Sequence, residues 1–216
     1  MNCEKLYDKI LKVNSTIWVF GYGSLLWKPN FEHKSRRVGY IRGFVRRFWQ
    51  ENTTYRGTPD APGRVANLVE SDGGIVWGVA FQVTGKEQVT RALDHLTNRE
   101  CTNGGYTSLV TTFYPRDKNN CVPVLVFTAT EDNPFYLGDA DLPQMSKQIV
   151  TAKGHAGSNV EYVTKIVDYV RKHIPEDNDE HLFDLDAKVR NDLKTQRLCS
   201  HLLMLHTHTK TTRFCH

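Results

Sequence analysis

A glycine-rich turn is the first stretch whose residue types could do chemistry. In "VFGYGSLLW", residues 19–27, an apolar run ends in Gly-Tyr-Gly-Ser. Glycines permit unusual backbone angles and close approach of the chain to a ligand. Successive N–H groups in such a turn can hold an anion or a polarised carbonyl oxygen. The candidate nest consists of Gly21, Tyr22, Gly23, Ser24 and Leu25. A plain tight turn is the alternative interpretation.

Two better-known phosphate-binding loops do not fit this turn. A dinucleotide fingerprint needs a third glycine three residues after the second, and that position is Leu26. A Walker loop needs Gly-Lys-Ser/Thr, which is absent here. If the turn binds a ligand, we therefore expect a small molecule, with Tyr22 and Leu25 as walls.

A carboxylate in "LDHLTNRECTNGGYTS", residues 93–108, is the second candidate. Glu100 follows Leu96 by four residues and Leu93 by seven, which places it on their face if the helix runs that far. A carboxylate on the core side at a cavity wall has a raised pKa and is a better proton acceptor near neutral pH. Alternatively, the helix stops early and Glu100 is a solvated residue paired with Arg99. The glycine pair that follows brings Tyr106 near the same region.

The elements that must position these residues follow from periodicity and turn signals. Strands are predicted first, then one helix and two further strands, and finally helices. This order favours an α+β domain with a mostly antiparallel β-barrel or sheet and flanking helices. The segment 36–50 alternates between apolar and basic residues and predicts a half-buried strand pair. Other predicted strands cover 16–22, 64–70, 74–83, 106–115 and 122–130, with a hairpin turn at 71–74, and predicted helices cover 86–98, 141–153, 158–173 and 179–196.

Length and composition indicate one globular domain. The chain has 216 residues, 39% hydrophobic and 24% charged, with a net charge of +4. We predict an N-terminal extension over 1–15, the domain over 16–196 and a disordered tail over 197–216. The N-terminus lacks a secretory h-region and no apolar run is long enough to span a membrane. The five cysteines are scattered, which favours reduced thiols and a cytoplasmic protein.

Two binding classes are disfavoured by the residue patterns. In the tail, His206 and His208 with a nearby cysteine could bind zinc, but the spacing matches no standard finger. We therefore predict no metal and no cofactor. Residues 36–49 interleave basic and aromatic side chains as nucleic-acid binders do, but the small net charge argues against that partner.

Several motifs together resemble a known family. "WVFGYGSLLWKP", "RRFWQENTTYRGTPDAPGRVANLVE", "VWGVAFQV", the Glu100 segment ending in Gly-Gly-Tyr, "DNPFYLG" and "GSNVEY" followed by "DEHLF" occur in the order typical of the ChaC-type γ-glutamylcyclotransferases. The likeness runs from about Trp18 to about Leu193. One departure is "GHAGSNVEY", in which His155 and Ala156 replace the Pro and Ser that the family often carries.

The resemblance implies a γ-glutamylcyclotransferase-like fold and the cytosolic conversion of glutathione to 5-oxoproline and Cys-Gly without a cofactor. It implies that Gly21 to Leu25 bind the γ-glutamyl group, that Glu100 is the catalytic acid and base, and that Tyr106 hydrogen-bonds the substrate. Ser24 has no recognisable histidine partner, so we expect it to bind substrate rather than attack it.

The sequence alone leaves open the roles of three arginines and the choice among related activities. Arg47, Arg56 and Arg64 are candidates for the glycine carboxylate of glutathione, because arginine suits carboxylates, or are simply solvated strand residues. The alternative activities are cyclotransfer on other γ-glutamyl-amino acids or γ-glutamylamines, and binding without catalysis on the same fold.

Overall fold

The computed structural model describes residues 15–102 and 105–211, and the side chains as far as residue 198. Its centre is a closed barrel in the order β1-β3-β2-β4-β5. All neighbouring strands are antiparallel except β1 and β5, which meet in parallel at Val19 and Leu125. The predicted α+β class with a mostly antiparallel barrel is confirmed. The barrel strands are β1 (Thr16–Gly21), β2 (Ser35–Asn52), β3 (Gly63–Thr84), β4 (Thr107–Pro115) and β5 (Val122–Thr128).

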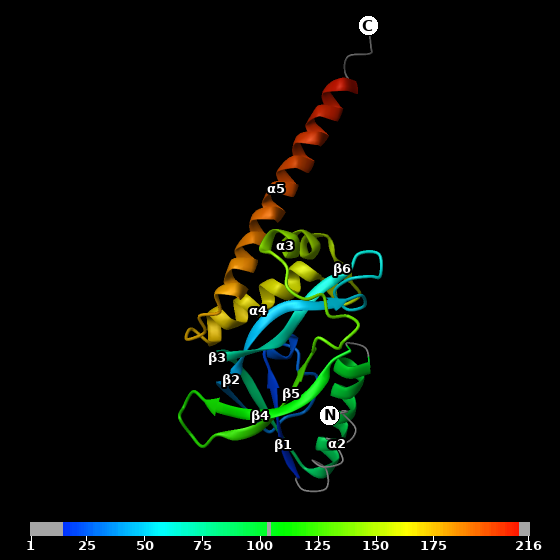
Figure 1. Ribbon diagram of the computed structural model, residues 1–216. Coiled ribbons are helices and arrows are strands. Elements are labelled where there is room, and N and C mark those ends of the chain that lie inside the picture. The colour runs from blue at the N-terminus through cyan, green and yellow to red at the C-terminus, as the bar shows by residue number, and fades with distance from the viewer. Residues whose placement is uncertain (1–14, 103–104, 212–216) are drawn as a thin grey trace.

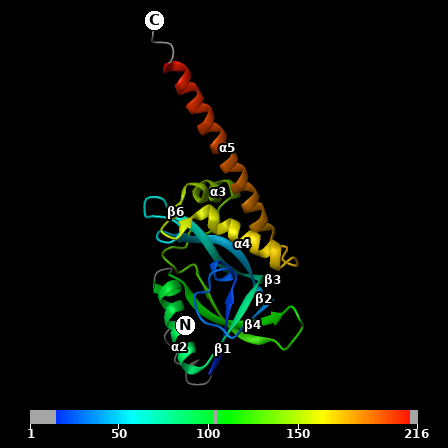
Figure 2. The same ribbon diagram turned by 180° about the vertical axis from the view of Figure 1, so that it is seen from behind.

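Helices cover two sides of the barrel (Figures 1 and 2). The elements outside the barrel are η1 (Ser24–Leu26), α2 (Lys86–Leu96), the π-helical turn η2 (Thr97–Thr102), α3 (Leu142–Thr151), the short pair β6 (Lys153–Gly154) and β7 (Gly157–Ser158), α4 (Asn159–His173) and α5 (Glu180–Thr211). Helix α2 lies beside the strands, and the C-terminal helices α3, α4 and α5 lie across the barrel. The predicted C-terminal helices are therefore confirmed.

Strand β2 is one long strand, so the strand pair predicted for residues 36–50 is wrong. Its pairing with β3 shifts register between Arg42 and Phe44, and Gly43 lies there at φ +83°. Because side chains alternate with a period of two, the shift exchanges the two faces. Before the shift Ile41 is buried, whereas after it Arg46 and Phe48 are buried. Polar side chains are thereby carried into the interior.

Strand β3 is also continuous, and the hairpin turn predicted at 71–74 is wrong. Ile75 pairs with Arg42 and Glu70 pairs with Phe44, so the four residues between them form an irregularity within one strand. Gly73 provides the positive φ that the irregularity requires. The actual hairpin joins β2 to β3 through residues 53–62, and this loop extends toward β6 and β7.

Two apolar clusters fix the helices to the barrel. Val89, Leu93 and Leu96 of α2 pack with barrel residues such as Val19, which confirms the predicted apolar face. The larger cluster joins the barrel interior to α3, α4 and the first half of α5. Helices α3 and α4 begin at side-chain caps, Asp141 and Ser158. The barrel end near α4 is therefore a rigid platform.

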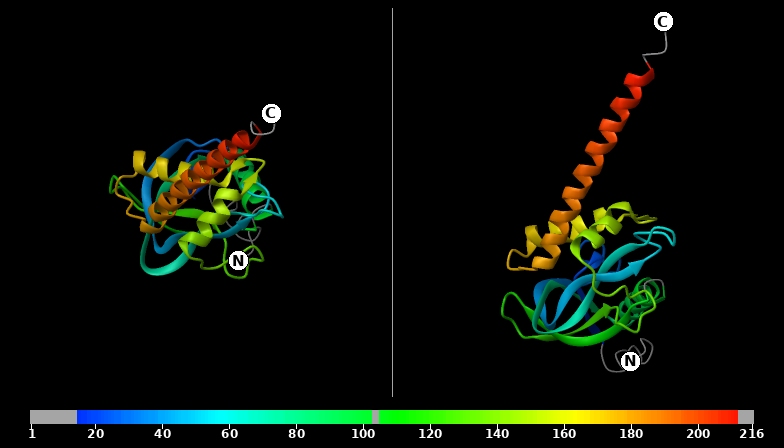
Figure 3. Two further views of the ribbon diagram at one scale, coloured as in Figure 1. Left: turned by 90° about the horizontal axis from the view of Figure 1, so that it is seen from above. Right: turned by 45° about the horizontal axis from the view of Figure 1, so that its top comes forward.

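Helix α5 runs to Thr211, well beyond the predicted end at 196 and through most of the predicted disordered tail. No glycine or proline interrupts 180–211, so nothing in the backbone stops the helix. Its second half projects away from the barrel (Figures 1 and 3). The side chains of His206 and His208, and all of residues 1–14, lie outside the described part.

No helix within the described residues is long and apolar enough to cross a membrane. Among the described side chains no group of His, Cys, Asp and Glu has the arrangement of a metal site.

Candidate active site

A cavity of about 130 Å³ opens at the end of the barrel where β1, β2 and β5 finish. This is far more room than the ~10–15 Å³ that one water needs. The glycine turn, η2, α4 and the 53–62 loop all contribute to its wall. Its lining includes Tyr22, Gly23, Ser24, Leu25, Trp27, Lys28, Asn52, Tyr55, Arg56, Ala66, Arg99, Glu100, Tyr106 and Tyr162.

The glycine turn is tight because of side-chain space, not positive φ. A Cβ on Gly21 would lie within contact distance of the Leu25 side chain, and one on Gly23 would press on the Tyr162 hydroxyl. Neither glycine has a positive φ. Gly23 is instead the residue before η1, whose first N–H groups have no partner inside the helix.

The N–H groups of Ser24 and Leu25 are among the donors that this turn leaves available. Leu26 donates to the Gly23 carbonyl at 3.0 Å, and the next two residues donate to the Ser24 carbonyl. No hydrogen bond runs from the N–H groups of Ser24 or Leu25 to any described residue. Both residues line the cavity. The N–H groups of Tyr22 and Gly23 likewise have no backbone partner among the described residues, so Ser24 and Leu25 supply two of the unpaired donors of the predicted nest.

Glu100 lies at the cavity rather than in bulk solvent. The α-helix ends at Leu96, but the wider π-helical turn η2 continues to Thr102 and carries the carboxylate inward. Its side chain is 14% exposed. Burial raises the pKa of the Glu100 carboxyl, and the Arg99 guanidinium opposes that rise. Glu100 is therefore at a cavity wall, as the first interpretation of the sequence expected, although the α-helix ends early and Glu100 pairs with Arg99, as the alternative expected.

Arg99 ties this carboxylate to the glycine turn. Its Nε lies 3.0 Å from Glu100 Oε1. Its Nη1 donates to the Lys28 carbonyl at 2.8 Å, and its Nη2 donates to Ser24 Oγ at 2.7 Å. All three guanidinium nitrogens are thus in use within the protein. In the sequence, Arg99 is recognisable only as an ion-pair partner of Glu100, because neighbours in sequence reveal nothing about a turn 75 residues away.

Three tyrosines form the polar floor of the cavity. Tyr22 donates to the Phe127 carbonyl at 2.8 Å, and Tyr106 donates to the Ala66 carbonyl at 2.5 Å. The Tyr162 hydroxyl accepts from the Ala66 N–H at 3.1 Å. Burial raises the pKa of all three phenols, that of Tyr162 to about 12. All three are therefore neutral at physiological pH.

Tyr162 was missed as a site residue. Its position on α4 matches the buried face of that helix, together with Val163, Ile166 and Val170. Such a position looks like ordinary core in a sequence. The Trp27 ring packs edge-on against it. Only the docking of α4 on the barrel end shows that its hydroxyl reaches the cavity.

The three candidate arginines have different surroundings. Arg47 lies away from this cavity and stacks on Trp49. Arg64 is buried, donates to the Phe48 carbonyl and Gln148, and holds β3 against α3. Arg56 alone of the three lines the cavity.

The described cavity wall offers no histidine to activate Ser24 as a nucleophile and no cysteine nucleophile. Ser24 Oγ accepts from Arg99, and no histidine or cysteine is among the described residues of the cavity wall. A serine without a neighbouring base is a weak nucleophile. The one acidic side chain among those wall residues is Glu100. Glu100 thus shares this cavity with Ser24 and Leu25, whose N–H groups have no backbone partner among the described residues.

Comparison with known proteins agrees with this fold. The model of the ChaC-like protein family matches residues 17–192. The chain is 44% identical over 179 residues to zebrafish glutathione-specific gamma-glutamylcyclotransferase 1, covering 82% of this chain and 91% of that one. The human protein of the same name is 45% identical over 167 residues, covering 77% and 75%.

Among solved structures, the chain resembles a yeast gamma-glutamyl cyclotransferase specific to glutathione. The TM-score is 0.76 and the identity 27%, over 82% of this chain and 97% of that one. Together, the family match over most of the barrel domain and these relatives show that the chain belongs to the ChaC-like protein family.

Proposed function

We propose that this protein is a glutathione-specific γ-glutamylcyclotransferase that releases 5-oxoproline and Cys-Gly from glutathione. The observation that carries the proposal is Glu100, a partly buried carboxylate with a raised pKa that shares one cavity with the unpaired N–H groups of Ser24 and Leu25. The relatives that bear this activity in their names support the choice of substrate. Glutathione acts in the cytosol, and we place the protein there.

The reaction needs a base before it needs a nucleophile. The α-ammonium of the γ-glutamyl group is protonated at neutral pH and cannot attack. Glu100 accepts one of its protons, and the freed amine attacks the γ-carbonyl carbon to form a C–N bond in a five-membered ring. Holding the substrate folded, with these two atoms in contact, removes much of the entropic barrier.

The negative charge that develops on the γ-carbonyl oxygen is the second requirement. In this proposal the N–H groups of Ser24 and Leu25, which have no backbone partner among the described residues, donate to this oxyanion. One such donor contributes about 3–4 kcal/mol in other acyl-transfer enzymes. The tetrahedral centre then collapses by breaking the bond to the cysteine nitrogen. Glu100 returns its proton to that departing amine. The ring nitrogen then gives up its second proton, and the released amine of Cys-Gly takes up a proton to become an ammonium, so protons balance and no covalent enzyme intermediate forms.

The environment of Glu100 suits both proton transfers. Burial raises its pKa toward neutrality, where a group accepts and releases protons most effectively. The Arg99 guanidinium opposes that rise in the pKa and so favours the ionised form, which is the one that can act as a base. Lys28, Arg56 and Arg99 outnumber the single carboxylate on the wall. This balance favours a substrate with a net negative charge, as glutathione has.

The test is release of 5-oxoproline from reduced glutathione, without added metal, by the wild type and by Glu100→Gln. We expect release by the wild type and a loss of roughly 10²- to 10⁴-fold in kcat for the variant. Glu87→Gln is the matched control, because that glutamate is exposed on α2. Normal turnover by folded Glu100→Gln would disprove the assigned role.

Substrate choice needs its own comparison. If γ-glutamylalanine is turned over as fast as glutathione, the protein acts on γ-glutamyl-amino acids in general. If neither substrate yields 5-oxoproline, the fold has been retained for binding and the proposal fails.

A further inference from the structure

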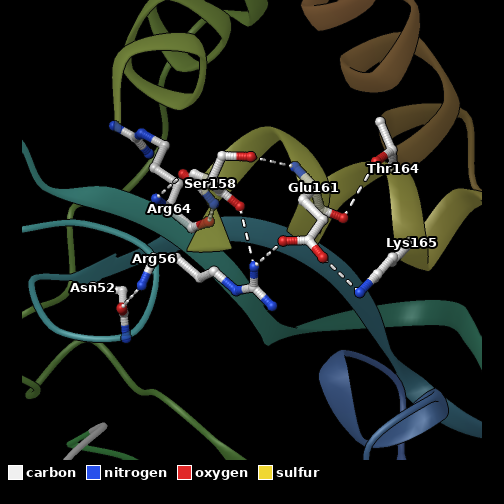
Figure 4. Close-up of polar contacts among 8 residues, drawn as sticks. Asn52, Arg56, Arg64, Ser158, Glu161, Thr164 and Lys165 are labelled. Atoms are coloured by element: carbon white, nitrogen blue, oxygen red, sulfur yellow. Dashed lines mark hydrogen bonds and ion pairs between the residues drawn. The ribbon is translucent and has the colours of Figure 1, made fainter. Parts of the chain in front are cut away.

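Arg56 lines this cavity, and of its three guanidinium nitrogens only Nη1 has a partner within the described residues. Its Nη1 donates to the Ser158 carbonyl at 3.2 Å and to Glu161 Oε2 at 3.0 Å (Figure 4). Its backbone N–H donates to Asn52 Oδ1 at 2.7 Å. Nε and Nη2 have no hydrogen bond to any described residue. Neither nitrogen is among the fully buried polar atoms that lack a partner.

The contrast with Arg99 is informative. Each of the three guanidinium nitrogens of Arg99 already has a partner within the protein. Arg56 keeps the Nε–Nη2 edge, which presents two parallel N–H groups. This edge matches the two oxygens of a carboxylate.

Contacts with the beginning of α4 hold the guanidinium of Arg56 in place through its Nη1. Glu161 also pairs with Lys165 Nζ at 2.6 Å, and its N–H donates to the Ser158 side chain that caps α4. Gly157, at φ +115°, lies directly against this group. A Cβ at Gly157 would collide with Glu161 Oε2 and contact Arg56 Nη1. The fork is therefore fixed before a ligand arrives, which reduces the entropic cost of binding.

Arg56 belongs to a different part of the cavity wall from the glycine turn and Glu100. It comes from the 53–62 loop, and its Cζ lies 5.7 Å from the Tyr162 ring centroid, whereas Gly23 of the glycine turn faces the Tyr162 hydroxyl. The charges of Arg56 and Glu100 both act on Tyr162. A molecule whose amine reaches Glu100 can thus extend past this ring toward Arg56.

We propose that the Nε–Nη2 edge of Arg56 is the subsite for the glycine carboxylate of glutathione, with Glu161 as its positioning residue. The inference rests on the proposed function, and it assigns the specificity for the tripeptide to this one side chain. Short γ-glutamyl-amino acids, whose carboxylate lies nearer to the scissile bond, do not reach it.

Binding is measured in the Glu100→Gln background, where turnover does not interfere. Reduced glutathione is titrated against glutathione whose glycine carboxylate is an amide. We expect the amide to bind about 10- to 100-fold more weakly, as for the loss of a charge-assisted hydrogen bond. Adding Arg56→Gln should weaken binding of glutathione by the same factor and leave binding of the amide unchanged.

Turnover gives the second readout. In the wild-type background, Arg56→Gln should raise KM for glutathione by a similar factor and change kcat little. Arg56→Lys should recover part of the loss, and Glu161→Gln should give a smaller rise in KM. Arg47→Gln, which lies outside the cavity, is the matched control and should leave KM unchanged.

Two outcomes would overturn the assignment of this subsite to Arg56. One is equal binding of glutathione and its amide by the Glu100→Gln protein, a result that does not depend on whether any Arg56 variant folds. Another is an equal loss for both peptides on Arg56→Gln, which would assign the arginine to the γ-glutamyl half. If the wild type binds glutathione but yields no 5-oxoproline, the proposed function fails while the subsite stands.

Discussion

Two clusters of buried charge lie in different parts of this molecule and are built differently. At the cavity, Glu100 faces one arginine, Arg99, and open space. Beside the start of α5, Arg46 is 1% exposed and faces two carboxylates, Asp177 Oδ2 at 3.5 Å and Asp179 Oδ2 at 3.3 Å. Its Nη2 also donates to the Trp77 carbonyl at 2.8 Å.

The difference shows that neither burial nor cavity size identifies the site. A hollow of about 570 Å³ adjoins the Arg46 cluster and is the larger of the two. There the charged groups pair with one another, although Arg46 Nε has no hydrogen-bond partner among the described residues. Asp179 also accepts from the Leu182 N–H at the beginning of α5. Those contacts fasten β2 to the C-terminal helix. At the smaller cavity, two backbone donors and one arginine edge have no partner among the described residues, and these are what a substrate can use.

The largest expected effect is on the structural cluster. Arg46→Met leaves Asp177 and Asp179 without their cation in a buried place. Breaking a buried pair from one side lowers the free energy of unfolding by about 3–5 kcal/mol. Chemical denaturation measures the loss, and kcat of the folded fraction should stay near the wild-type value.

Arg47→Met is the control, one residue along the strand and only half-buried. It should change the free energy of unfolding by about 0.5 kcal/mol or less. If Arg46→Met reduced kcat while leaving stability intact, the division between the two clusters would be wrong.

A smaller effect is expected for Arg99→Gln, and it tests the functional cluster. Arg99 lowers the pKa of Glu100, so its removal raises that pKa further. The base form of Glu100 is then lost at a higher pH, and the acidic limb of the kcat/KM profile moves to higher pH. The rate at neutral pH should fall on the order of tenfold to hundredfold, because the turn also loses its tie to η2.

Arg99→Lys separates the two contributions of Arg99. The lysine retains a positive charge near Glu100 but cannot reach Ser24, Lys28 and Glu100 together. Its acidic limb should therefore lie closer to that of the wild type, while its rate stays low. An unshifted limb in Arg99→Gln would mean that Arg99 does not tune the carboxylate.

Much of this arrangement follows from local sequence patterns. The glycine turn and Glu100 are recognisable because each breaks a rule: small residues at the end of a strand, and a carboxylate on an apolar helix face. Strand and helix order also follows from periodicity. These features depend on neighbours within a few residues, which a sequence displays directly.

What could not be predicted depends on distant contacts or on small shifts of register. The positive φ of Gly43 changes which face of β2 is buried, and this alone decides that Arg46 is interior and Arg47 is not. The choice of Arg56 among three arginines needs the contact between the 53–62 loop and α4. Arg99 becomes a tie only once η2 and the glycine turn meet.

The smallest expected effect has the opposite sign to that of Arg46→Met. Burial raises the pKa of Glu100 in the folded protein above its ordinary value of 4.5, so the folded state disfavours the ionised form. Wild-type stability should fall as pH rises from that ordinary value through the folded pKa. Glu100→Gln has no charge to bury, so its unfolding temperature should exceed that of the wild type above this window and approach it below.

The measurement is a series of thermal unfolding scans at several pH values for both proteins. Each kcal/mol corresponds to about 2–4 °C for a protein of this size. A Glu100→Gln protein less stable than wild type at neutral pH would show that the Arg99 pair outweighs burial. The carboxylate would then belong with Arg46 among the structural charges. A more stable and inactive variant would mean that Glu100 is retained at the expense of stability, as expected of a group selected for proton transfer.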